Sequence, residues 1–142
     1  MSAYKRYNCT FTDRDILLEA LKILGLKAVE HKTPQPLIGF EGKAREQKAD
    51  IIVSKESLDE NFTSCSNDLG FAWNPAQNSF DMIVSDYDAG KKVPERIRQA
   101  YAKIALERLM EEHRFTIEEC TDSSELAQRT RIDVNIVAST IM

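Results

Sequence analysis

Four residues of this sequence have side chains suited to holding a ligand or a partner: Trp73, Asn74, Gln99 and Tyr101. The first two belong to a predicted hairpin, and the last two belong to a predicted long helix. Aromatic rings offer apolar contact area, and side-chain amides can orient a ligand through hydrogen bonds. A pocket between the hairpin and the helix is therefore one interpretation, and a packed corner of the hydrophobic core is the other.

The residue types that usually carry catalysis or bind metals lack the required spacing. The histidines, His31 and His113, stand in no Cys-x-x-Cys or His-Glu-x-x-His pattern. Cys9 falls on the apolar face of a predicted strand, and neither Cys65 nor Cys120 has a cationic neighbour that would favour a thiolate. The sequence also lacks a Gly-rich phosphate loop and a Gly-x-Ser-x-Gly elbow. We therefore expect no catalytic residue, no metal site and no cofactor.

Three aspartates in and after the hairpin are a candidate for a cation site. Asp86 and Asp88 follow Asp81, and oxygen ligands at alternate positions can hold a hard cation. A calcium loop needs further oxygen ligands and a closing glutamate, whereas Lys91 and Lys92 follow here. The sequence therefore argues against a bound cation.

Apolar periodicity predicts the secondary structure. A period of two, or a short β-rich run, predicts strands at residues 4–11, 27–30, 37–40, 49–54, 68–74, 80–84, 115–120 and 130–138. Helical spacing predicts two helices, one between a cap at Thr12 or Asp13 and a stop at Gly25, and one from Val93 to Arg114. Segments 33–36, 55–67 and 86–92 are predicted to be irregular, because they are polar or contain two prolines.

These elements predict one α+β domain over residues 1–142. Its core would cover about residues 4–120, followed by a C-terminal strand at 130–138. Two helices packed on one mostly antiparallel sheet are an economical way to bury the predicted apolar faces. The order of elements also resembles a ferredoxin-like, split βαβ layout with an inserted hairpin.

The composition is typical of a soluble globular protein. The 142 residues carry a net charge of −4, and 30% of them are charged. Lys and Arg are scattered, so the basic stripe typical of nucleic-acid-binding proteins is missing, although a local patch stays possible. There is no apolar run long enough for a signal peptide or a membrane span, and three cysteines without a pairing pattern fit a reducing compartment. We expect a cytoplasmic protein.

Several short motifs resemble one family. Residues 39–42 (Gly-Phe-Glu-Gly) precede the strand at 49–53, residues 69–74 contain Gly-Phe-x-Trp-Asn, and residues 99–103 contain Gln-x-Tyr-Ala. Together with the first strand and helix, they resemble the domain-of-unknown-function 1257 family of small proteins from cyanobacteria, plastids and some phages, known in plastids as hypothetical chloroplast reading frame products. The resemblance covers about residues 4–120. It implies no catalytic residues, because the family has no established activity.

Three functional hypotheses remain. The first is a small, soluble, non-enzymatic interaction or regulatory protein of unknown partner, because an acidic protein can dock on a basic surface; a phage origin would make a host protein the partner. The second is a small-ligand-binding protein or enzyme, with a pocket between the Trp73 hairpin and the last helix. The third is nucleic-acid binding, which the net charge disfavours. Homo-oligomers formed through an edge strand are compatible with each hypothesis.

Overall fold

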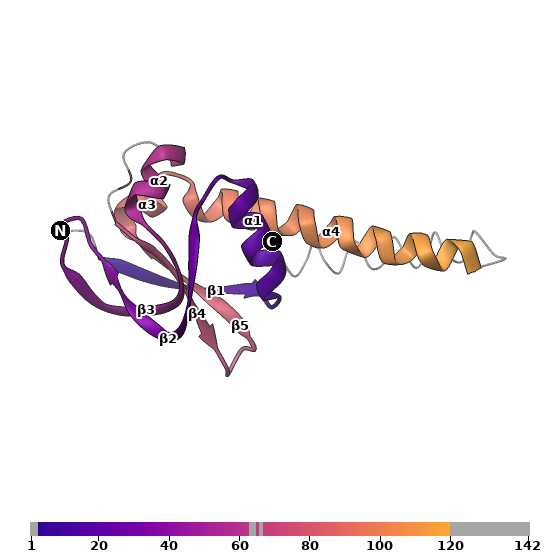
Figure 1. The fold of residues 1–142 in the computed structure, drawn as a ribbon, viewed down its shortest axis with the longest axis horizontal. Coiled ribbons are helices and arrows are strands. Elements are labelled where there is room, and N and C mark those ends of the chain that lie inside the picture. The colour runs from indigo at the N-terminus through magenta and orange to yellow at the C-terminus, as the bar shows by residue number, and fades with distance from the viewer. Residues whose placement is uncertain (1–2, 63–64, 66, 120–142) are drawn as a thin grey trace.

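A computed structural model describes residues 3–62, 65 and 67–119 of the chain. It has two layers, a five-stranded antiparallel sheet and helices on one face of that sheet (Figure 1). The strands are β1 (Tyr4–Phe11), β2 (Ala28–Ile38), β3 (Ala44–Val53), β4 (Leu69–Asn74) and β5 (Ser79–Ser85). The helices are α1 (Arg14–Ile23), α2 (Lys55–Phe62), α3 (Asp86–Ala89) and α4 (Val93–Glu119). The predicted α+β class and antiparallel sheet are confirmed.

The strands lie side by side in the order β1-β5-β4-β3-β2. The chain from β2 to β5 forms an antiparallel meander, and β1 lies at the far edge beside β5. Helix α1 joins β1 to β2, and three strands separate these two in the sheet, whereas a split βαβ unit leaves a single strand between them. The ferredoxin-like layout is therefore not confirmed.

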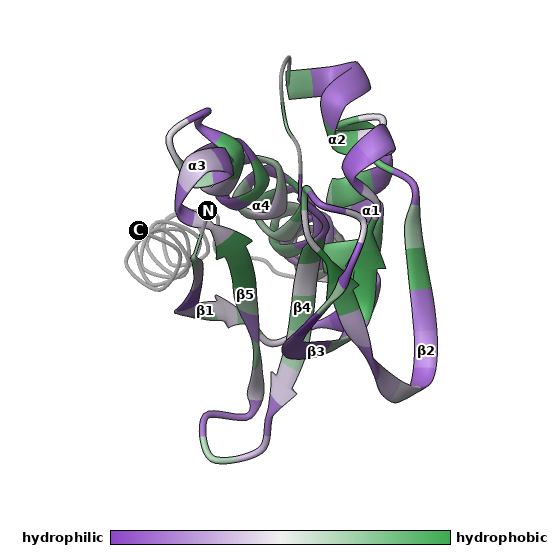
Figure 2. Cartoon of the chain, turned by 90° about the vertical axis from the view of Figure 1, so that its left-hand side faces the viewer, coloured by the Kyte–Doolittle hydropathy of each residue, from purple (hydrophilic) through white to green (hydrophobic). Residues whose placement is uncertain are grey.

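The main hydrophobic core lies between the sheet and the helices (Figure 2). It contains most of the side chains that the apolar periodicity predicted to face inward. They include Cys9, Phe11, Ile16, Leu17, Ala20, Leu21, Ile51, Val53, Leu69, Phe71, Phe80, Met82, Val84, Ile97, Tyr101 and Ile104. Each large apolar side chain contributes roughly 1.5–3 kcal/mol on full burial, so this layer is the main source of stability.

A second, smaller cluster lies on the other face of the sheet, where Leu37, Ala49, Ala72 and Ile83 are buried together. Gly70 of β4 permits this packing. A Cβ atom at position 70 would come within 2.7 Å of the Ala49 Cβ and 2.9 Å of the Leu37 Cδ2, which is closer than van der Waals contact. The β2–β3 hairpin can therefore approach β4 only because residue 70 has no side chain.

Helix α1 begins and ends where the sequence predicts. The Asp13 side chain accepts hydrogen bonds from the backbone amides of Asp15 and Ile16, which satisfies two of the free N–H groups at a helix start. Gly25 follows the last turn with a φ of 77°, the left-handed conformation common after a helix end. This cap fixes the first turn of α1 directly after β1.

The prediction of only two helices is not confirmed. Helix α2 occupies most of the segment 55–67 that was expected to be a loop, and α3 occupies part of the expected linker at 86–92. The Ser54 Oγ accepts the Ser57 amide at the start of α2, and Leu58 and Phe62 are buried. The four-residue spacing of these two apolar residues was the signal for a helix.

Two further elements differ from the prediction. Strand β2 runs through Pro34 and Pro36, which an edge strand tolerates because its outer amides need no partner. The strand expected at 115–120 is wrong, because α4 continues to Glu119 and no glycine or proline ends it at Arg114. Figure 1 shows α4 extending well past the sheet. The strand expected at 130–138 lies outside the described residues.

Helix α4 is long, but it carries many charged residues. Neither α4 nor any other helix in the described part of the chain is apolar enough over a sufficient length to cross a membrane.

Candidate functional site

The tip of the β4–β5 hairpin carries a pair of aromatic rings. Trp73 and Phe80 are cross-strand partners, and their ring centroids lie 4.9 Å apart in an edge-to-face arrangement. Phe80 is buried, whereas Trp73 keeps 38% of its surface exposed. Trp73 therefore lies at the rim of the core, where one side of its ring faces protein and the other side faces solvent.

An open hollow of about 330 Å³ lies beside this pair. Four residues line it: Thr12, Arg14, Trp73 and Phe80. They come from the β1–α1 connection, the first turn of α1 and the hairpin, and we call them the Trp73 surface. Its hairpin side is apolar, and its α1 side supplies a hydroxyl group and a guanidinium group.

Two contacts hold the Arg14 guanidinium in the Trp73 surface. Its central carbon lies 5.3 Å from the centroid of the Phe80 ring, within the range of a cation–π contact. Its Nη1 donates a hydrogen bond to the Glu30 Oε1 at 2.9 Å. Both charged side chains are about half exposed, so the ion pair adds little stability and mainly orients Arg14.

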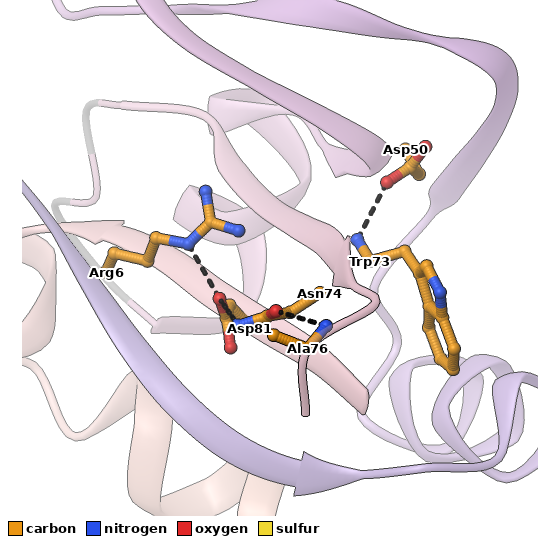
Figure 3. Close-up of polar contacts among 6 residues, drawn as sticks. All are labelled: Arg6, Asp50, Trp73, Asn74, Ala76 and Asp81. Atoms are coloured by element: carbon orange, nitrogen blue, oxygen red, sulfur yellow. Dashed lines mark hydrogen bonds and ion pairs between the residues drawn. The ribbon is translucent and has the colours of Figure 1, made fainter. Parts of the chain in front are cut away.

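The backbone of Trp73 is fixed by a side chain of the neighbouring strand. The Asp50 Oδ2 accepts the Trp73 amide at 2.8 Å (Figure 3). The paired register of β3 and β4 ends at Ile51 and Phe71, so the Asp50 carboxylate replaces a carbonyl acceptor beyond the ladder. The Trp73 ring is thus anchored at its backbone and points away from the polar groups around Asp81 (Figure 3).

Asn74 uses both ends of its amide within the hairpin. Its Oδ1 accepts the Ala76 amide, and its Nδ2 donates to the Asp81 Oδ2, each at 3.1 Å. Asp81 is almost fully buried and also accepts the Arg6 Nε at 2.7 Å (Figure 3). The first of these bonds is an Asx-type turn contact. Asn74 therefore shapes the hairpin tip.

The two helix residues proposed with Trp73 lie elsewhere. Tyr101 is buried against Phe11, with ring centroids 4.9 Å apart, and its hydroxyl accepts the Asp13 amide at 3.1 Å. Gln99 is exposed, and residues two positions apart on a helix do not share a face. Neither Gln99 nor Tyr101 therefore lines the hollow beside Trp73.

Thr12 and Arg14 line the side of the hollow that was expected to come from α4. Nothing in their spacing points to Trp73, which lies about 60 positions further along the chain. The available signal was indirect: the Asp13 cap predicts that Arg14 is the first residue of a helix, exposed at the end of the strand that pairs with the hairpin.

A buried polar cluster lies at the opposite end of β4. The Asp68 carboxylate accepts the backbone amides of Ile38 and Lys55, at 3.0 and 2.9 Å, and the Tyr4 hydroxyl donates to the Asp68 carbonyl at 2.9 Å. Burial, and then the Asp68 charge, raise the pKa of the Tyr4 hydroxyl, while the Arg45 guanidinium opposes this rise. Three separate chain segments are therefore tied to one residue.

The preceding residue, Asn67, extends this cluster. Its Oδ1 accepts the Phe40 amide at 3.0 Å, and its Nδ2 donates to the Ser85 Oγ and to the Asp88 Oδ2. Asn67, Ser85 and Asp88 are buried. We call Asn67, Asp68, Ser85 and Asp88 the Asp68 cluster. It was not predicted from the sequence, because its bonds join residues from distant segments.

The three candidate aspartates for a cation are used separately. Asp88 belongs to the Asp68 cluster, Asp81 pairs with Arg6, and the Asp86 Oδ1 accepts the Ala3 amide. Among residues 3–62, 65 and 67–119, no group of three or more histidine, cysteine or carboxylate side chains is placed to hold a metal ion.

The thiols of the two cysteines in the described part of the chain have raised pKa values. Burial raises the pKa of the Cys9 thiol, and the nearby Arg98 guanidinium opposes this rise. Burial, together with the charges of Asp88 and Asp59, raises the pKa of Cys65 to about 11. A nucleophilic thiolate needs the opposite shift, so both residues act as core side chains near neutral pH.

Comparison with known proteins identifies a family. No curated protein and no solved structure matches the chain. A family model described as "protein of unknown function" matches residues 20–130. This range includes the last turn of α1, the hairpin with Trp73 and all of α4. Because this match covers most of the sequence, the chain belongs to the DUF1257 family of proteins of unknown function.

Proposed function

We propose that this protein is a non-enzymatic binding protein of the cytoplasm that docks a partner protein on the Trp73 surface. The observation that carries the proposal is the exposure of its single tryptophan beside an open hollow. A tryptophan ring gains free energy when its remaining apolar surface is removed from water. A partner side chain that fills the hollow would supply that burial.

The composition and order of the Trp73 surface support this proposal. Tryptophan and arginine are the residues most enriched among those that dominate protein–protein binding energies. Here Trp73 is held by Phe80 and Asp50, and Arg14 is held by Phe80 and Glu30. Groups that are already fixed lose less conformational entropy on binding, which raises affinity.

A small-molecule ligand is the second candidate occupant, because a volume of about 330 Å³ falls within the usual range of ligand pockets. The open shape of the hollow favours the protein partner, since pockets for small molecules bury most of the ligand surface. The four lining residues offer few walls for such enclosure.

The proposal is tested by quantitative affinity capture from the native host, comparing wild type with Trp73→Thr. Threonine removes the ring and supplies a β-branched side chain, which strands favour. We expect the variant to lose at least one saturable partner while its circular dichroism spectrum stays native. Phe40→Thr is the matched control, because Phe40 is also an exposed aromatic residue, 43% accessible, but lies outside the Trp73 surface.

Equal recovery of every partner with folded Trp73→Thr and with wild type would contradict docking on this surface. Loss of the partner with both variants would mean that the partner binds exposed apolar surface in general and not the Trp73 surface. A wild-type protein that captures no protein but binds a small metabolite with a change in tryptophan fluorescence would favour the second candidate.

A further inference from the structure

The hydrogen-bonding groups of the Trp73 surface are mainly donors. The Arg14 guanidinium and the Trp73 indole N–H can only donate, and the Thr12 hydroxyl can both donate and accept. None of the four lining residues has a carboxylate side chain. The chemistry of the hollow therefore matches a ligand group that accepts hydrogen bonds.

The Arg14 guanidinium has an unused edge. Its Nη1 is bonded to Glu30, whereas its Nε and Nη2 have no hydrogen-bond partner within the described part of the chain. The Nε and Nη2 groups form a parallel pair of donors that fits the two oxygens of a carboxylate. The contact with Phe80, 5.3 Å from the guanidinium carbon to the ring centroid, and the bond to Glu30 keep the guanidinium beside the hollow.

The indole N–H of Trp73 is likewise unused. Its ring nitrogen has no hydrogen-bond partner among the residues that the structure describes, while the ring itself packs on Phe80. A ligand could thus contact an apolar ring face and an N–H donor on the same side chain. The hollow suits an apolar group that lies next to an acceptor.

We propose that the Trp73 surface binds an acidic side chain, aspartate or glutamate, that stands beside an apolar residue in the partner protein. The carboxylate bonds the Nε–Nη2 edge of Arg14, and the apolar neighbour packs against Trp73. This inference rests on the proposed function and names the chemistry of its partner.

Glu30 is an internal competitor for this carboxylate. It already neutralises Arg14 at 2.9 Å, and Asp13 and Asp15, the sequence neighbours of Arg14, add further negative charge. These charges weaken the binding of an anion. Glu30→Gln keeps an acceptor oxygen for the Arg14 Nη1 and removes only the negative charge, so Arg14 stays oriented and binding strengthens. Removal of the Arg14 charge weakens binding. Opposite effects of two substitutions within one ion pair cannot arise from a shared loss of folding.

The experiment measures tryptophan fluorescence during titration with a capped ten-residue peptide that repeats an aspartate–leucine pair. Trp73 is the only tryptophan, so a change in emission reports directly on the hollow. The control peptide has asparagine in place of each aspartate and thus keeps the shape but removes the charge. We expect the acidic peptide to bind more tightly than the control, with an affinity that falls as salt is added.

Arg14→Gln lowers the affinity for the acidic peptide by about tenfold, the scale of one charge-assisted hydrogen-bond pair. Glu30→Gln raises it by about threefold, the scale of an exposed ion pair. Equal binding of both peptides up to millimolar concentration, or a weaker affinity in Glu30→Gln, overturns the inference. If cellular partners still require Trp73 in that case, the docking surface stands and only its acidic ligand is rejected.

Discussion

The polar groups at the two ends of strand β4 differ in whether their hydrogen bonds are made within the chain. At its start, Asp68 is buried and both of its carboxylate oxygens accept backbone amides. At its end, Trp73 is partly exposed beside a guanidinium with an unused edge. The first end has its hydrogen bonds completed within the chain, while the second end keeps donors and apolar surface that the fold itself does not need.

This difference separates a structural role from a binding role. Buried polar groups stabilise a fold only when their partners are present, since an unsatisfied buried amide is costly. The Asp68 cluster meets that condition by joining β1, β2 and the start of α2. The Trp73 surface does not have to meet it, because solvent or a partner can satisfy its donors. We therefore expect substitutions at the two ends to affect different properties.

The largest effect is expected from Asp68→Ala. The substitution leaves the partly buried amides of Ile38 and Lys55 without an acceptor, and we expect a loss of about 3 kcal/mol in the free energy of unfolding. Arg14→Gln, at the other end, removes only an exposed ion pair and a surface ring contact, so its cost is below about 1 kcal/mol. Urea denaturation of the two variants measures both values.

Asp68→Asn is the control for the Asp68 prediction. It keeps one acceptor oxygen and the side-chain volume, so its loss is expected to be about half that of the alanine variant. If Asp68→Ala and Arg14→Gln had similar costs, the proposed division between a structural end and a binding end would be lost.

The second effect concerns the face of the sheet opposite the helices. Gly70→Ala places a methyl group 2.7 Å from the Ala49 Cβ and 2.9 Å from the Leu37 Cδ2, and overpacking of this kind costs about 2 kcal/mol. Adding Ala49→Gly removes the nearer clash and is expected to restore part of the stability. Thermal unfolding of the single and double variants tests this, and a double variant no better than the sum of its single changes would contradict the contact.

The sequence predicted the parts of the fold that depend on local signals. Strand β1 and helix α1 follow from alternation, the Asp13 cap and Gly25. The hairpin also follows, because its two apolar faces flank a turn-rich segment. The order of the strands and the approach of Ala49 to Gly70 depend on long-range packing, and no local pattern encodes them.

The candidate site was predicted only in part, and for a related reason. Trp73 was identified from its type and its place in the hairpin. Tyr101 belongs to the same buried stripe as Ile97 and Ile104, so helical periodicity alone predicts that it lies in the core. Arg14 was missed because its contact with Phe80 joins segments 66 positions apart, which the spacing within either segment cannot reveal.

A further effect, on reactivity, is expected at Cys65, beside the Asp68 cluster, and it tests whether this end stays closed. Its pKa is raised from 9.0 to about 11 by burial and by the charges of Asp88 and Asp59. At pH 8 the folded protein therefore holds about a hundredfold less Cys65 thiolate than the unfolded chain. Alkylation of Cys65 should be correspondingly slow, measured by mass spectrometry in a Cys120→Ser background that leaves Cys9 as the other thiol.

The same shift gives a direction for stability at alkaline pH. The folded state favours the neutral thiol, so the contribution of Cys65 is complete below pH 9 and is lost as the pH rises from 9 towards 11. A Cys65→Ala variant lacks this titration and should show a flatter decline in the free energy of unfolding over that window. Rapid alkylation of Cys65 at pH 8 in the folded protein would mean that the thiol is accessible. The Asp68 end of β4 would then not be closed, and its contrast with the Trp73 surface would be lost.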